Sequence, residues 1–185
     1  MKKNYSSQRA GFTLVEAMVA ISILSLSITG PLVIAQKGIA SSVYSRDQIT
    51  ASYLAQEAVE YIRNGRDTNV IAGDDWLSGF ETCMSTTNPA GCRIDARYLD
   101  FKDATGLAVT SCLSTCPRMY RNTPSGLYGY LTSSGWVQTP FTRTVLITPV
   151  GSDDREAIVS VKVSWSTTLF SPVKEFSVRS SLFKL

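Results

Sequence analysis

The feature that most constrains this chain is an apolar run from Phe12 to Ala35 that contains one charged side chain, Glu16. A helix rises about 1.5 Å per residue, so a helical run of this length would cover roughly 36 Å. The hydrocarbon core of a bilayer is about 30 Å thick. The sequence therefore predicts a membrane-spanning helix near the N-terminus, with one acid close to its start.

The charges that flank this run set its expected orientation. Lys2, Lys3 and Arg9 precede it, and no acid occurs before Gly11. Positive charge beside a membrane helix favours the cytoplasmic side. We therefore expect a single-pass protein with its N-terminus inside and the remaining chain outside the cytoplasmic membrane, where disulfides persist.

Composition limits the function of the remaining chain. The formal net charge is +3, and without Lys2, Lys3 and Arg9 the chain is neutral, with no basic footprint for nucleic acid on the body as a whole. The chain has no histidine, which excludes Ser-His-Asp and Cys-His catalysis and imidazole metal ligands. No phosphate-binding glycine loop or activated nucleophile is recognisable. We predict neither an enzyme nor a cofactor.

Glu16 poses an energetic problem, because a carboxylate in a membrane helix costs several kcal/mol unless it finds water or a partner. One solution keeps Glu16 near the hydrated headgroups. Another supplies a positive charge from a second molecule. Cleavage after Gly11 would create a free amine on Phe12, which the Glu16 carboxylate of a neighbouring subunit could bind. That pairing would fix the axial register of a helical bundle.

The residues around this acid resemble a known processing signal. A short basic leader ends in Gly11, the stretch Phe-Thr-Leu-Val-Glu follows from Phe12 to Glu16, and an apolar helix comes next. This combination resembles the N-terminus of type IV pilins and type II secretion pseudopilins. The resemblance implies that a prepilin peptidase cuts after Gly11 and methylates Phe12, and that Glu16 takes part in subunit recruitment. It also implies that Gly30 and Pro31 form a helix-breaking region.

A second resemblance concerns the type of subunit. The stretch SYLAQEAVEYIRNGRD at residues 52–67 is similar to the helix end of minor pilins, in the branch that includes the I-type pseudopilins. The family implies a minor structural subunit of a pilus or pseudopilus. Its partners would be other pilin subunits and the bacterial inner-membrane assembly machinery, and its filament would be periplasmic or extracellular.

The helical pattern continues beyond the apolar run. Pro31 lacks an amide donor and crowds the carbonyl four residues earlier, so a kink is expected at Gly30-Pro31. Residues 36–64 form an amphipathic second half, with apolar side chains such as Ile49, Tyr53 and Leu54 at helical spacing. Asn64-Gly65 resembles a C-terminal stop signal.

The rest of the chain predicts an α+β fold. Residues 65–140 are rich in turn-forming residues and contain all the cysteines, with short strands expected at 92–99 and 127–132. Residues 141–185 show the period-two alternation of strands and predict an antiparallel sheet of three strands. A sheet with one apolar face would pack on the second half of the helix, which is the pilin-like arrangement that the resemblance also implies.

The four cysteines have three possible pairings. We favour the local pairs Cys83–Cys92 and Cys112–Cys116, each closing a short loop. The alternative is a zinc site with four cysteine ligands, which the unequal spacings disfavour. The predicted role of these residues is structural, with no metal bound.

Several alternatives stay open at this point. Val33-Ile34-Ala35 could end an ordinary secretory signal peptide, which would make the chain a secreted protein that begins at Gln36, and an uncleaved anchor is a further alternative. Asp74-Asp75 and Asp153-Asp154 could bind calcium, although solvated carboxylates in turns are commoner. A last group could stack on nucleic acid or sugar in an adhesive or DNA-uptake module displayed on a pilus: Tyr120, Tyr128, Tyr130 and Trp136, with Arg118 and Arg121.

Overall fold

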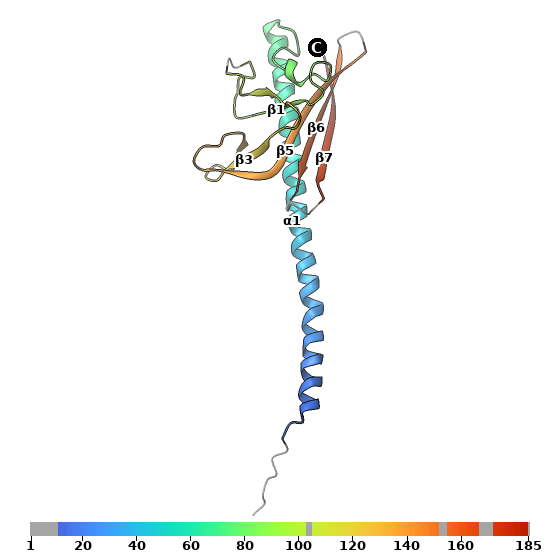
Figure 1. Cartoon of the computed structure of the whole chain (residues 1–185). Coiled ribbons are helices and arrows are strands. Elements are labelled where there is room, and N and C mark those ends of the chain that lie inside the picture. The colour runs from blue at the N-terminus through green and yellow to red at the C-terminus, as the bar shows by residue number, and fades with distance from the viewer. Residues whose placement is uncertain (1–10, 103–104, 152–154, 167–171, 185) are drawn as a thin grey trace, which may run out of the picture. The chain divides into compact units, whose positions relative to one another are not determined.

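The computed structural model describes residues 11–102, 105–151, 155–166 and 172–184. The chain divides into two compact units, one up to Arg46 and the other from Asp47 onward. Helix α1 (Leu14–Ala72) contributes its first part to one unit and its last part to the other. The rest of the second unit is a β-sheet with its connecting loops (Figure 1).

The first unit is helical through the predicted helix break. The α-helix is continuous across Gly30 and Pro31, so the helix-breaking region that the resemblance implied does not end the helix, and the expected kink there stays a prediction. Pro31 removes a single amide donor, and the backbone hydrogen bonds on either side still hold the helical conformation. Proline does remove a helical hydrogen bond, but one missing hydrogen bond does not end a helix of this length.

The predicted helix stop at Asn64-Gly65 is also wrong, because α1 continues to Ala72. There the Gly73 amide donates to the Val70 carbonyl and the Asp74 amide donates to the Asn69 carbonyl, the two hydrogen bonds of a Schellman cap. Gly65 has a packing role instead. A Cβ on Gly65 would lie 2.5 Å from Cζ of Phe80, so only glycine lets that ring approach the helix.

The second unit contains one seven-stranded sheet. Its central part follows the order β2-β1-β5-β3-β4, while β6 pairs with the other edge of β5 and β7 with β6. All the pairs between these strands are antiparallel. The strands are β1 (Cys92–Ile94), β2 (Val109–Ser111), β3 (Arg118–Asn122), β4 (Tyr128–Gly129), β5 (Trp136–Val150), β6 (Glu156–Trp165) and β7 (Lys174–Phe183), and a short 3-10 helix, η1, covers Glu81–Cys83.

The predicted C-terminal sheet is confirmed. Strands β5, β6 and β7 form two continuous antiparallel ladders, from Phe141↔Trp165 to Val150↔Glu156 and from Glu156↔Phe183 to Trp165↔Lys174. Strand β5 begins at Trp136, earlier than expected, because its first residues pair with β3. Pro140 cannot donate to that ladder, and the register shifts near it, where the Thr139 hydroxyl donates to the Met119 carbonyl at 2.8 Å.

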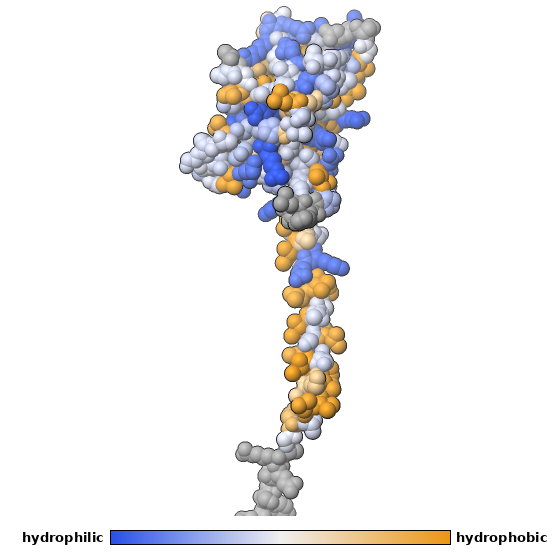
Figure 2. Space-filling model, in the orientation of Figure 1, coloured by the Kyte–Doolittle hydropathy of each residue, from blue (hydrophilic) through white to orange (hydrophobic). Residues whose placement is uncertain are grey.

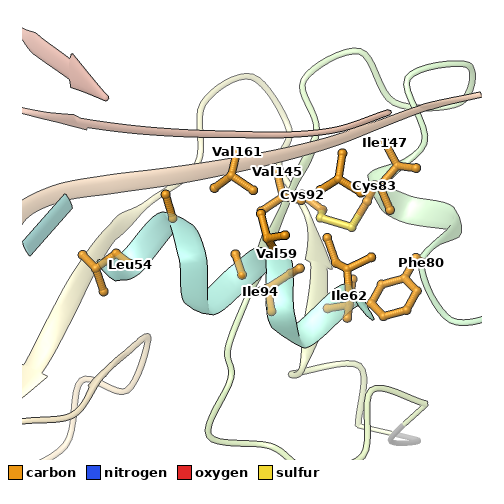
Figure 3. Packing of buried hydrophobic residues seen from close by; sticks show 14 of the residues in the cluster. Leu54, Val59, Ile62, Phe80, Cys83, Cys92, Ile94, Val145, Ile147 and Val161 are labelled. Atoms are coloured by element: carbon orange, nitrogen blue, oxygen red, sulfur yellow. A yellow bond between two sulfur atoms is a disulfide. The ribbon is translucent and has the colours of Figure 1, made fainter. Parts of the chain in front are cut away.

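The core lies between the last part of α1 and the inner face of the sheet. Leu54, Val59 and Ile62 of α1 belong to the same buried cluster as Val145 of β5 and Val161 of β6 (Figure 3). Alternation along β6 explains this directly, since Val159, Val161, Val163 and Trp165 are buried while the residues between them are not. Each fully buried aliphatic side chain contributes about 1.5–3 kcal/mol.

The loop-rich region adds to this core more than its sequence suggested. Trp76, Phe80, Ile94 and Met119 are all essentially buried and belong to the same apolar cluster. The Phe80 and Phe101 rings stack with their centroids 5.0 Å apart. The expected strands at 92–99 and 127–132 exist, but they are shorter, and β2 and β3 were not predicted.

One charged side chain is buried within the apolar contact between helix and sheet. Arg143 of β5 donates from Nη1 to the Leu54 carbonyl at 2.7 Å and to the Glu57 carboxylate at 2.6 Å. Its Nη2 donates to the Ile94 carbonyl at 2.6 Å. The guanidinium thereby joins α1, β1 and β5, and it satisfies polar groups that apolar side chains could not.

Candidate processing and assembly site

The candidate site begins where α1 begins. Gly11, Phe12 and Thr13 precede the helix and are exposed, so the bond between Gly11 and Phe12 lies in non-helical backbone. The Thr13 hydroxyl accepts a hydrogen bond from the Glu16 amide at 3.3 Å. Thr-Leu-Val-Glu is therefore also a helix-capping sequence, with Thr13 as the N-cap and Glu16 at the position that a capping box requires. This role was readable from the spacing, and the sequence analysis missed it.

The Glu16 carboxylate has no partner among the residues that the structure describes. Among the residues that the structure describes, no hydrogen bond or ion pair engages its oxygens. It lies in the first turn of α1, where the positive end of the helix dipole favours an anion. The dipole reduces the cost of this charge, but the carboxylate keeps its full capacity to accept hydrogen bonds from another molecule.

The hydroxyl groups in the same segment are satisfied locally. Ser22 donates to the Met18 carbonyl, Ser25 to the Ile21 carbonyl and Ser27 to the Leu24 carbonyl, each at 2.8 Å. Such bonds to the preceding helical turn let serine lie in an apolar environment without an unpaired donor. In contrast to these hydroxyl groups, the Glu16 carboxylate receives no hydrogen bond from the helix itself.

The first part of α1 has the properties of a membrane span by length and composition. One stretch reaches a mean hydropathy of 2.1, and none of it is buried within the chain. Apolar side chains cover this segment and appear as orange atoms in Figure 2. Because apolar surface of this extent is unfavourable in water, it calls for a lipid or protein environment.

The disulfides lie far along the chain from this segment. Cys83 is bonded to Cys92 and Cys112 to Cys116, the local pairs expected from the sequence. The first disulfide joins η1 to β1, and the second closes the turn that follows β2. With every cysteine in a disulfide, the alternative of a zinc site with four cysteine ligands does not apply.

The aromatic residues considered for ligand stacking are engaged by arginines other than the predicted ones. The Arg97 guanidinium lies 4.5 Å from the centroid of the Trp136 ring, and that of Arg93 lies 4.9 Å from the centroid of Tyr130. Tyr128 packs edge-on against Phe141. Three of the four candidate rings therefore already contact side chains of this chain, which favours an internal packing role for them.

A buried carboxylate organises this cluster. Asp95 accepts two hydrogen bonds from the Arg97 guanidinium and a third from the Tyr130 amide. The hydrogen bond to Asp95 raises the pKa of Arg97, against the opposing effect of burial. Burial raises the pKa of the Tyr130 phenol, against the effect of the nearby Arg143 guanidinium. These charges hold the β1–β4 region together.

The calcium alternative gains no support from the described residues. Asp74 forms an ion pair with Lys102, and Asp75 accepts a hydrogen bond from the Leu77 amide. No group of three candidate ligands for a metal ion occurs in the part of the chain that the structure describes. Asp153 and Asp154 lie outside that part.

Comparison with known proteins places a family signal on the N-terminal segment. Residues 6–30 match the family model of the prokaryotic N-terminal methylation motif. Neither the comparison with curated proteins nor that with solved structures found a match. The N-terminus thus carries a type IV pilin-like prepilin signal, and the fold is pilin-like and α+β, with a long N-terminal helix, an antiparallel sheet and two disulfides.

Proposed function

We propose that this chain is a minor structural subunit of a type IV pilus or a type II secretion pseudopilus. The observation that carries the proposal is the methylation motif at residues 6–30. It is followed by a helical segment whose apolar side chains are not covered by any other part of the described chain. A prepilin peptidase would cut after Gly11 and methylate Phe12. The helix would remain in the inner membrane until other subunits and the assembly machinery remove it.

The proposed assembly mechanism follows from the charges at the helix start. Cleavage after Gly11 replaces a peptide bond with a positively charged amine on Phe12, next to the cap residue Thr13. The Glu16 carboxylate has no partner among the described residues, and it would form an ion pair with the Phe12 amine of an adjacent copy. In a bundle from which water is excluded, an ion pair with hydrogen bonds offsets the desolvation of both groups, whereas either charge alone would be strongly unfavourable.

The proposed pairing also gives the filament a register. Apolar helices slide past one another with little change in energy, because many offsets bury similar surface. With one such acid and one such amine per subunit, the favoured axial offsets between neighbouring helices are those that bring the two charges within about 4 Å. The C-terminal unit, which has its own core, would face solvent on the outside of the filament.

The proposed division of the chain follows these roles. Residues 1–11 are the leader, residues 12–35 the transmembrane segment, and the helix beyond them links this segment to the outer unit. That helical part extends to Ala72, so the region with loops and disulfides begins after it. The resemblance of residues 52–67 to minor pilins supports the choice of a minor subunit.

Coexpression with a prepilin peptidase tests the proposal. Mass spectrometry of the mature chain should show an N-terminus at methylated Phe12. The Gly11→Val variant, with a branched side chain at the cleavage site, should keep its leader under the same conditions. A mature chain that begins at Gln36 would instead support an ordinary signal peptide and contradict the proposal.

A further inference from the structure

A groove lies on the outer face of the sheet, away from α1. It has a volume of about 560 Å³, and strands β5, β6 and β7 form its floor. Two loop segments that the disulfides restrain form its wall, Pro89-Ala90 and Ser114–Cys116. The processing and assembly site does not use this groove, which lies entirely within the second unit.

Strand register arranges the floor as a grid of nine side chains. One row is Thr142, Ser164 and Glu175, the next is Thr144, Lys162 and Ser177, and the third is Leu146, Ser160 and Arg179. Neighbouring strands lie about 4.8 Å apart, and alternate residues of one strand about 6.7 Å apart. Five of the nine floor positions therefore present hydroxyl groups at regular intervals.

These hydroxyls are available to a ligand. Among the described residues, no hydrogen bond is formed by the side chains of Thr142, Thr144, Ser160, Ser164 or Ser177. Thr139 of β5, which lies outside the groove, differs because its hydroxyl bonds the Met119 carbonyl. A free hydroxyl both donates and accepts, so a row of them matches a ligand that also carries hydroxyl groups.

The charges of the floor add a preference for an anion. Lys162 Nζ lies 3.5 Å from Glu175 Oε1, so the charges of these two side chains offset one another. Arg179 has no ion-pair partner within the described ranges, which leaves one positive charge at the end of the hydroxyl grid. A guanidinium binds a carboxylate through two parallel hydrogen bonds, a geometry that lysine cannot reproduce.

The walls are held close to the floor by backbone packing. Gly91 has a φ of +74°, and a Cβ there would lie 2.5 Å from the Val145 carbonyl oxygen of β5. The Gly91 carbonyl accepts a hydrogen bond from the Cys112 amide at 2.9 Å, which joins the two wall segments. The disulfides and this hydrogen bond therefore restrain both wall segments beside the sheet.

We propose that this groove binds an acidic sugar, with Arg179 holding its carboxylate and the Ser and Thr hydroxyls of the floor binding its hydroxyl groups. The lining contains no aromatic side chain, so the sugar ring has no stacking surface and the binding is weak. A peptide fits less well, because Leu146 is the main apolar side chain that the outer face of the floor offers.

Saturation-transfer NMR on the full chain in micelles tests the proposal, with methyl glucuronide as the probe and methyl glucoside as its neutral match. We expect the glucuronide to bind at least about tenfold more tightly and to shift the amide signals of β5–β7. Arg179→Gln should abolish this preference, and the double variant Thr144→Val with Ser160→Ala should weaken binding of both sugars. Arg121→Gln, which changes an exposed arginine outside the groove, should leave binding unchanged.

Several results would overturn the proposal. Equal binding of the two sugars, or an unchanged preference in Arg179→Gln, would remove the role of Arg179. Acetate that competes as well as the glucuronide would show that the groove binds simple anions only. An acidic peptide that binds more tightly than the glucuronide would replace a sugar ligand with a peptide. None of these measurements requires filament assembly, so failure here leaves the proposed function intact, and the reverse also holds.

Discussion

The two parts of helix α1 contain similar apolar residues in opposite environments. Before Arg46, Leu24 is 62% exposed and Ile21 65% exposed. After Asp47, Leu54 is 4% exposed and Ile62 is fully buried against the sheet. Leucine and isoleucine occur in both parts, so these two residue types do not by themselves distinguish them. The difference is that the chain itself covers the second part, whereas the first must be covered by lipid or by other molecules.

The residues that pack in each part also differ. Ala51, Ala55 and Ala58 are fully buried, so the sheet contacts the helix closely along a stripe of small side chains. The first part instead presents large aliphatic residues around its surface, which suits contact with lipid tails and later with other helices. Helix α1 therefore has one part whose packing interface is complete within the chain, after Asp47, and one part that awaits a partner, before Arg46.

The largest effect that tests the completed interface is expected for Arg143→Ala. The variant leaves a cavity and removes the donor from the Ile94 carbonyl and the counter-charge from Glu57. We expect a loss of about 3–5 kcal/mol in the free energy of unfolding. Denaturant unfolding of the full chain in micelles measures it. Arg121→Ala, at an exposed position, should change stability by less than about 0.5 kcal/mol. A loss below about 1 kcal/mol for Arg143→Ala would show that the buried guanidinium does not hold the interface.

The disulfides give the next largest effect, and it should stay local to the second unit. Chain-entropy estimates give about 3 kcal/mol for Cys83–Cys92, removed by paired substitution with alanine, and about 2 kcal/mol for Cys112–Cys116. Hydrogen exchange should then show faster opening in residues 80–120 than in β5–β7. Equal acceleration in both regions would mean that the disulfides support the whole sheet.

A matched glycine pair compares the two parts of the helix directly. Gly65→Ala should destabilise the second unit by about 1–3 kcal/mol, because the added Cβ would overlap Phe80. Gly38→Ala meets no atom within 4 Å, so in a single chain it should not destabilise and should favour the helix by up to about 1 kcal/mol. Circular dichroism and denaturant unfolding measure both. An equal change in stability for both variants would contradict the distinction between the part of α1 that the sheet covers and the part that the chain leaves exposed.

The smallest predicted effect concerns pH. Burial raises the pKa of the Tyr130 phenol above its ordinary value of 10.0. The folded chain therefore holds this proton more tightly than the unfolded chain does, so the contribution to stability is complete below pH 10.0 and is lost as the pH rises above it. Tyr130→Phe should lose less stability between about pH 9 and about pH 11 than the wild type. Parallel pH curves for the two proteins would contradict this account.

Sequence periodicity predicted the C-terminal sheet well because β5 and β6 each bury alternate residues and β7 alternates between partly buried and exposed residues over most of its length. Val159, Val161 and Val163 alternate with polar residues, and a pattern of this kind needs no knowledge of the partner surface. The same reasoning was less accurate for the helix. Ile49 and Tyr53 were included in the packed face, yet they are 57% and 67% exposed, while the small alanines beside them are buried.

The features that sequence did not predict depend on contacts between distant segments. Gly65 resembles a helix stop until Phe80 is seen to require its missing side chain. Arg143 resembles a surface charge in a strand until Glu57 and the Leu54 carbonyl are placed beside it. The candidate site was predictable because its residues are consecutive, from Gly11 to Glu16, and need no tertiary contact to be recognised.

The most direct test of the central claim is the incorporation of Glu16→Ala into filaments. The variant should insert into the membrane and lose its leader normally, because the cleavage site and the Thr13 cap remain. We expect its amount in sheared filaments, relative to the processed protein in membranes, to fall at least about tenfold, a loss of about 1.4 kcal/mol or more per subunit added. Incorporation equal to the wild type would contradict the pairing of Glu16 with the Phe12 amine of a neighbouring copy.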